Sequence, residues 1–194
     1  RRSVVLRFAA VMSLAGLIWG IFAYFFYDNP PALLPPFGYV LVSLLNVLTF
    51  AITRRFRLFR FIQLTASLLL PFFMMLLLGG LIHGSATILW SLIAPLGALL
   101  VSNRRRATGW FTAFLALVLV SVLIEPLVSE GVTTAPWVRT TFFGMNIVGP
   151  LTAAFGLVNH FLRQKDQILA ENVRLFREMQ RQAQEMSSLA EIGN

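Results

Sequence analysis

Long apolar stretches alternate with short polar breaks along most of the chain. A helix needs about 20 mostly apolar residues to cross the hydrocarbon core of a bilayer. The period-two alternation that marks a membrane β-barrel is not visible in the sequence. The pattern therefore predicts an all-α integral membrane protein, a six-transmembrane-helix bundle with these spans: Val4–Phe26, Pro36–Thr53, Phe59–Ile82, Ala86–Val101, Gly109–Pro126 and a last one that begins near Trp137.

The apolar pattern gives way to a charged helical pattern after the sixth stretch, with no Pro or Gly between Leu157 and Ile192. We expect two domains: residues 1–162 form the transmembrane domain, and residues 163–194 form a cytoplasmic signalling helix. A heptad of core positions can be written along this helix, which predicts a parallel homodimeric coiled coil. Its core residues are Ile168, Asn172, Leu175, Met179, Gln182, Met186 and Leu189.

The coiled-coil interpretation has alternatives. A second stripe competes with the first, so the helix could form a poor coiled coil or switch register. A solvated helix that packs against another domain is also compatible with the pattern. An unbroken helix from Trp137 to Ile192 would be on the order of 80 Å long, enough to carry a shift from the membrane into the cytoplasm. The competing stripe consists of Leu169, Val173, Phe176 and Ala183.

The composition supports a membrane location. Hydrophobic residues make up 57% of the 194 positions and charged residues only 12%, whereas a soluble domain averages roughly 25% charged residues. The lack of Cys argues against a disulfide-stapled secreted fold. The net charge of +8 comes from short basic runs between apolar stretches, which argues against nucleic-acid binding. We therefore expect the lipid bilayer, and not a nucleic acid, as the partner of this region.

The basic residues predict the orientation, because cytoplasmic loops of membrane proteins are enriched in Lys and Arg. The opposite breaks contain Arg139 as their only cation. Both termini are therefore expected in the cytoplasm of a multi-pass protein of the bacterial inner membrane. The basic breaks contain Arg1, Arg2, Arg7, Arg54, Arg55, Arg57, Arg60, Arg104, Arg105, Arg106, Arg163 and Lys165.

Motifs of known catalytic chemistry are missing from the sequence. It contains two His, one Lys and no Cys, without a Walker-type loop, an HExxH motif or a Gly-x-Ser-x-Gly elbow. We therefore expect this chain to be the regulatory part of an enzyme and not its catalytic part. Glu125, His83 and Asp28 are all expected at the outer face and form a candidate divalent-cation site. Their spacing matches no metal motif, so a simple position of Glu125 at the water line stays open.

Polar residues inside the apolar stretches are candidates for hydrogen bonds between helices. Proline residues there free backbone carbonyls and can shape a pocket. An apolar ligand pocket near Met74 and Trp90 is one interpretation, and plain packing is the other. The polar candidates are Asn46, Gln63, Asn146 and Asn159, and the proline residues are Pro71, Pro95 and Pro150.

The central part of the chain, "RFIQLTASLLLPFFMMLLLGGLIHGSATILWSLIAPLGALLVSNRRRATGWFTAFLALVLVSVLIEP", resembles the six-helix membrane anchor of bacterial class III adenylate/guanylate cyclases. The segment from Pro71 to Gly97 is the most specific part of this resemblance. It implies a parent cyclase that produces a cyclic nucleotide such as cAMP and works as a dimer. The tail "LAENVRLFREMQRQAQEMSSLAEIGN" instead resembles the helix that leads into a GAF domain in sensor histidine kinases.

Together, these observations predict the membrane anchor and receptor module of a bacterial signalling enzyme. A cue would pass through a dimeric helical stalk to a cytoplasmic output domain that follows this segment, a cyclase or alternatively a histidine kinase. A small transporter or channel is a further alternative. No Lys or acid lies near the middle of a span and no repeat of broken helices is visible, which argues against transport.

Overall fold

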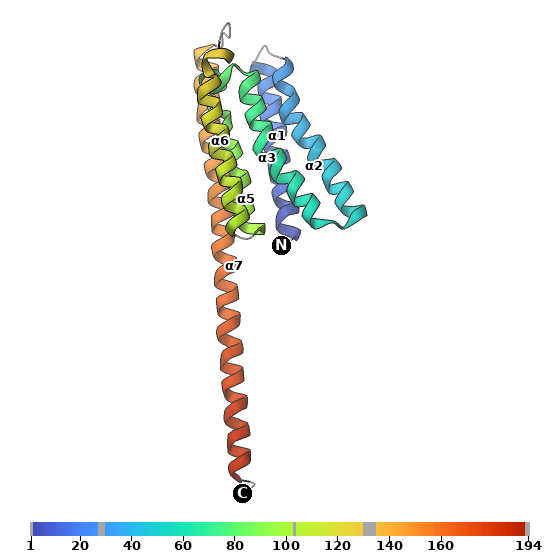
Figure 1. The fold of residues 1–194 in the computed structure, drawn as a ribbon, viewed down its shortest axis with the longest axis vertical. Coiled ribbons are helices and arrows are strands. Elements are labelled where there is room, and N and C mark those ends of the chain that lie inside the picture. The colour runs from blue at the N-terminus through green and yellow to red at the C-terminus, as the bar shows by residue number, and fades with distance from the viewer. Residues whose placement is uncertain (1, 27–29, 103, 130–134, 193–194) are drawn as a thin grey trace. The chain divides into compact units, whose positions relative to one another are not determined.

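The computed structural model describes the backbone of residues 2–26, 30–102, 104–129 and 135–192, and within these ranges it contains helices and turns but no strand (Figure 1). Within these ranges, side chains are described for Leu6 and from Ala9 to Gln182, with the exception of Val101. The predicted all-helical fold is therefore confirmed. The elements are α1 (Arg2–Phe26), η1 (Pro30–Leu33), α2 (Leu34–Thr53), α3 (Phe56–Leu77), α4 (Gly80–His83), η2 (Thr87–Leu92), α5 (Ile93–Val101), α6 (Arg104–Val128) and α7 (Pro136–Ile192).

Five of the described helical segments are long and apolar enough to cross a membrane. The fourth predicted stretch differs, because it is divided into η2 and α5 and gives only the shorter apolar segment Thr87–Leu100. Two residues with left-handed backbone conformation precede it, Ser85 and Ala86, which have φ of 53° and 56°. The count of six crossings stays a prediction. The five long segments are Ala9–Phe26, Pro30–Thr53, Phe56–Leu77, Arg104–Val128 and Pro136–Gln182.

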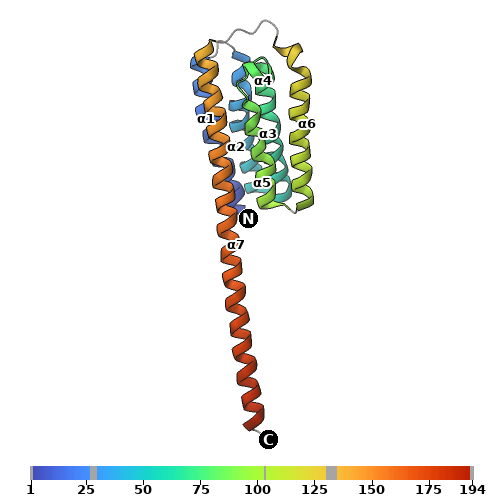
Figure 2. The same cartoon turned by 90° about the vertical axis from the view of Figure 1, so that its left-hand side faces the viewer.

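The chain divides into two compact units, Arg1–Phe155 and Gly156–Asn194. The helix α7 contributes its first turns to the first unit and the remainder to the second. Within the first unit, α2 packs along α3, α1 packs against α2, and α6 packs against α5 (Figures 1 and 2). The predicted domain boundary after residue 162 stays a prediction.

Aromatic and small side chains form the contacts inside the first unit. The rings of Phe50 and Phe59 stack with centroids 4.9 Å apart, which joins α2 to α3. Trp19 of α1 meets Phe142 of α7 edge to face at the same centroid distance. Gly16 allows α1 to approach the start of α2, as small residues do between membrane helices.

Large apolar side chains also cover the outside of the first unit. Leu123 and Leu127 of α6 are 76% and 78% exposed, and Ile52 of α2 is 83% exposed. Contiguous apolar surface of this kind is rare on soluble monomers, and it is typical of surfaces that face lipid or a partner. The helices are therefore compatible with a membrane protein.

Candidate functional site

A fully buried amide, the side chain of Asn146, joins three segments of the first unit that lie far apart in the sequence. Its Oδ1 accepts hydrogen bonds from the indole Nε1 of Trp19 in α1 at 2.8 Å and from Nε1 of Trp90 in η2 at 3.0 Å. Its Nδ2 donates to the carbonyl of Ser85 at 2.9 Å and to Oγ1 of Thr87 at 3.0 Å. We call Trp19, Trp90, Asn146, Ser85 and Thr87 the Asn146 junction.

The orientation of the amide follows from its partners. An indole nitrogen can only donate a hydrogen bond, so both Trp19 and Trp90 require the oxygen of Asn146 on their side. The amide then uses two acceptor positions and two donor positions, which is its full capacity. Any rearrangement that pulls one partner away leaves a buried polar group without a hydrogen bond, at a cost of about 1–3 kcal/mol. The junction therefore favours one arrangement of the three segments.

The part of α7 in the first unit is buried along a narrow stripe. Val138, Phe142, Asn146 and Pro150 are buried and follow one another at intervals of four residues. Such spacing places them on one face of a helix. Asn146 on this stripe reaches Trp19 and Trp90. In addition, Oγ of Ser85, in the loop before η2, donates a hydrogen bond to the carbonyl of Arg139 in α7 at 3.1 Å.

Trp90 lies directly on the backbone of α7. A Cβ atom added to Gly149 would stand 2.8 Å from Cη2 of the Trp90 ring, so no larger residue fits there without movement. The same ring donates its Nε1–H to Asn146, one turn earlier. Trp90 is therefore held by the hydrogen bond of its indole nitrogen and by the close packing of its six-membered ring on the backbone at Gly149.

A small cavity adjoins the junction. Its volume is about 60 Å³, smaller than the roughly 150 Å³ apolar cavity that accepts benzene. The wall is almost wholly apolar, apart from a few polar groups such as those of Thr87 and Tyr39. The residues that line the cavity include Met12, Gly16, Trp19, Pro71, Met74 and Trp90.

A second buried polar cluster lies between α2 and α3. Nε2 of Gln63 donates to the hydroxyl of Tyr39 at 2.7 Å and to Oγ of Ser43 at 2.9 Å. Nδ2 of Asn46 donates to the carbonyl of Phe59 at 2.8 Å and lies 3.3 Å from Oε1 of Gln63. The expected roles of Asn46, Gln63 and Asn146 in hydrogen bonds between helices are therefore confirmed, whereas the role of Asn159 stays a prediction.

The carboxylate of Glu125 in α6 accepts backbone hydrogen bonds from the first turn of α4. Its Oε1 accepts a hydrogen bond from the backbone N–H of Ile82 at 3.1 Å, and its Oε2 accepts one from Leu81. Gly79 and Gly80 have φ of 89° and 94°, a conformation that favours glycine, and they aim these N–H groups at the carboxylate. This contact gives Glu125 a structural role that its position in the sequence did not reveal.

The predicted cation site is not tested by these contacts. The described residues contain no cluster of three His, Asp or Glu side chains that could hold a metal ion, but Asp28 lies outside the described residues. Nδ1 of His83 is buried and has no hydrogen-bond partner in the described part of the chain. A site built from Glu125, His83 and Asp28 therefore stays a prediction.

The second unit carries apolar side chains in solvent-exposed positions on a helix. Ile168, Leu175 and Met179 of the predicted core are 58%, 50% and 65% exposed, and Phe176 of the competing stripe is 60% exposed. Asn172 and Gln182 are exposed as well. Met186 and Leu189 lie where the structure describes the backbone but not the side chains. Both stripes are thus available for a partner.

Among the described side chains of the second unit, Nε of Arg174 lies 2.9 Å from Oε1 of Glu178. An exposed pair at this spacing supports a helix by only about 0.3–0.5 kcal/mol. This pair therefore adds little to the stability of the helix.

Comparisons of this chain with protein-family models, with curated proteins and with solved structures find no match. The resemblance of the sequence to cyclase membrane anchors and to GAF-linked helices therefore stays a prediction.

Proposed function

We propose that this chain is the membrane anchor and receptor module of a bacterial signalling protein. In this proposal, the first unit senses a membrane or extracellular cue and the second unit passes the change to an output domain. The observation that carries the proposal is the position of Asn146. It holds Trp19 and Trp90 to α7, and α7 is helical from Pro136 to Ile192.

The exposed apolar surface and the charge distribution support insertion into a bilayer. Arg54 and Arg55 lie in the break that follows α2, and the other described cations of the first unit except Arg139 lie in the first turns of α1, α3 and α6. By the positive-inside rule, this end of the unit faces the cytoplasm and the Glu125 end faces outward. Crossing by α7 then brings the second unit into the cytoplasm.

The exposed stripes support self-association of the second unit. A helix turns about 100° per residue, so the stripe through Ile168 and Leu175 lies next to the stripe through Leu169 and Phe176. Charged residues such as Arg174, Arg177 and Glu178 fall on the remaining side. One wide apolar face with two possible seams suits a parallel dimer that changes register.

The mechanism we infer is a shift between two packings of α7 in the first unit. Trp19 and Trp90 line the cavity and also belong to the Asn146 junction. An occupant of the cavity, or a change in lateral lipid pressure, therefore acts on the junction through these two residues. Such an occupant can shift the population only through a different affinity for the two packings. The output reaction, cyclase or kinase, rests on the sequence resemblance.

Disulfide cross-linking in bacterial membranes tests this proposal. The chain contains no Cys, so Leu175→Cys places a single thiol in one stripe and Phe176→Cys a single thiol in the other. We expect both variants to give cross-linked dimers. We also expect Asn146→Leu to change the ratio of the two yields, whereas Thr152→Leu, an exposed position of α7, leaves the ratio unchanged.

The outcomes separate the parts of the proposal. Monomers in both Cys variants would overturn the dimeric stalk. Dimers whose ratio does not respond to Asn146→Leu would leave the stalk in place and overturn coupling through the junction.

A further inference from the structure

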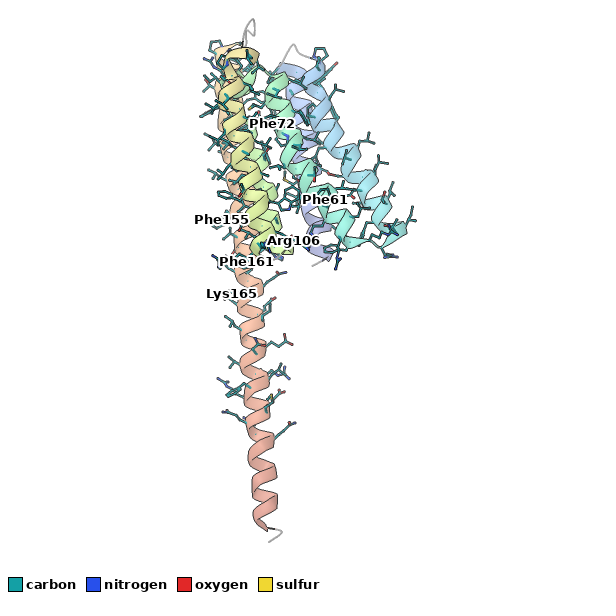
Figure 3. All side chains as sticks on the ribbon, in the orientation of Figure 1. Phe61, Phe72, Arg106, Phe155, Phe161 and Lys165 are labelled. Carbon is teal, nitrogen blue, oxygen red and sulfur yellow. The ribbon has the colours of Figure 1, made fainter. Side chains whose placement is uncertain are left out.

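A groove lies between the N-terminal turns of α3 and α6, on the side of the first unit where the basic residues gather. Its volume is about 500 Å³. Figure 3 labels Phe61 of α3 and Arg106 of α6, which lie near each other at this end. The residues that line the groove include Arg57, Arg60, Phe61, Arg106, Gly109 and Trp110.

Three arginine residues line this groove, and no acidic residue does. The sequence contains no Asp or Glu from residue 29 to residue 124. Along α6, Glu125 is separated from Arg106 by 19 positions, or roughly 28 Å of helix, well beyond the screening length of about 8–10 Å. Arg57, Arg60 and Arg106 therefore give the groove a positive potential, which favours an anionic ligand.

The guanidinium group selects among anions. Its planar set of N–H donors matches the oxygen atoms of a phosphate in a bidentate arrangement. Arginine residues on two different helices can therefore bind one phosphate from two sides. A phosphate bound to Arg60 and Arg106 would link α3 to α6.

The remainder of the wall is apolar. The rings of Phe61 and Trp110 lie with centroids 5.9 Å apart, and Phe61 is 59% exposed. Aromatic residues gather at the level of lipid headgroups, where one part of the ring meets hydrocarbon and another meets water. A ligand that fits both parts of the wall carries a phosphate and, next to it, a hydrocarbon chain.

We propose that this groove binds an anionic phospholipid, with its phosphate on Arg57, Arg60 and Arg106 and its first acyl carbons against Phe61 and Trp110. This inference rests on the proposed membrane location. Basic pockets between membrane helices on the cytoplasmic side bind such headgroups in other proteins. The lipid would brace α3 against α6 and so make the packing of the first unit depend on membrane composition.

The test uses the whole chain in nanodiscs of phosphatidylcholine that contain a minor fraction of phosphatidylglycerol. Native mass spectrometry of the protein released from the discs measures how much phosphatidylglycerol stays bound. The test variant is Arg60→Gln/Arg106→Gln. The matched control, Arg55→Gln/Arg105→Gln, removes the same charge from exposed positions at the same end that do not line the groove.

We expect the groove variant to retain about tenfold less phosphatidylglycerol, because charge-assisted hydrogen bonds are lost, and the control to retain the wild-type amount. Equal losses in both variants would indicate general surface attraction and overturn the site. Competition by millimolar glycerol phosphate would show that a soluble phosphate is the ligand and overturn the lipid. Failure of the wild type to enter nanodiscs would instead contradict the proposed membrane function.

A second variant keeps the charges and fills the space. A Cβ atom on Gly109 meets no atom within 4 Å, so Gly109→Phe can be accommodated without a clash at Cβ and projects a ring toward the groove. We expect loss of bound phosphatidylglycerol with all three arginines intact. Unchanged binding in a folded Gly109→Phe variant would overturn the groove as the binding site.

Discussion

The backbone N–H of Ile82 donates to Oε1 of Glu125 at 3.1 Å, although 43 positions separate the two residues in the sequence. The second carboxylate oxygen accepts the N–H of Leu81. One side chain of α6 thus satisfies two N–H groups in the first turn of α4, where the helix provides no partners of its own. The contact fixes the turn between α3 and η2, and through η2 it helps to place Trp90.

Glu125→Gln should destabilise the first unit. The neutral amide keeps one oxygen but presents an N–H₂ group to the other backbone donor, so one charge-assisted hydrogen bond is lost and two donors face each other. We expect a loss of about 1–3 kcal/mol, measured as a lower midpoint of thermal unfolding in detergent. An unchanged midpoint would contradict the structural role of Glu125.

The same variant tests the predicted cation site. If Glu125 binds a divalent cation together with His83 and Asp28, added Ca²⁺, Mg²⁺ or Zn²⁺ should raise the unfolding midpoint of the wild type but not of Glu125→Gln. A wild-type midpoint that does not respond to any of these cations would leave Glu125 with its role in the turn alone.

Gly149→Ala should disturb the Asn146 junction. The added methyl group would press on the ring of Trp90, which is fixed at its edge by Asn146. Ala is the better helix former by about 1 kcal/mol, so a net loss of stability would show that the steric conflict outweighs this gain. Tryptophan fluorescence and the unfolding midpoint would measure the change.

Gly144→Ala is the matched control for this prediction. It lies on the same helix, and a Cβ atom there meets nothing within 4 Å. We expect this variant to be neutral or slightly stabilised. If the two glycine variants behave alike, Trp90 does not pack on α7 as described.

Gln63→Leu should loosen the contact between α2 and α3. Leucine has a similar size but cannot donate to Tyr39 and Ser43 or accept from Asn46, so three buried polar groups lose a partner. Hydrogen bonds between membrane helices contribute about 0.6 kcal/mol each on average, which gives an expected loss of about 1–2 kcal/mol. Thr65→Leu should have little effect, because the Thr65 hydroxyl donates to the carbonyl of Phe61 within the same helix.

The sequence predicted the helical class and three of the polar residues that bond between helices, because both are local or compositional properties. Hydropathy identifies apolar helices, and a lone Asn or Gln within one must find a partner. The partners themselves were not predictable. Trp19 lies 127 positions from Asn146, and only the packing of α1 against α7 decides that the two meet.

The divided fourth stretch had no clear signal in the sequence. Gly79 and Gly80 mark a turn, but Ser85 and Ala86 also adopt positive φ values of 53° and 56°, which neither residue type favours. The residues from Val138 to Pro150 that are buried in the structure follow one another at every fourth position. Equally apolar neighbours such as Phe143 and Val148 are exposed, so the sequence alone does not distinguish this face of α7.

The stalk prediction concerns Leu175 and Met179, two exposed apolar residues of the predicted seam. Replacement of both by Asp would place two like charges from each chain at the core of a parallel dimer, where unpaired buried charges are strongly unfavourable. We expect cross-linking through an added Cys at Ile168 to be abolished. Replacement of Arg177 and Arg181 by Asp, on the charged side, should leave cross-linking intact. Cross-linking that persists in the Leu175→Asp/Met179→Asp variant would show that the heptad through Ile168 is wrong, and loss in both variants would show that the helix associates through a wider surface than either stripe.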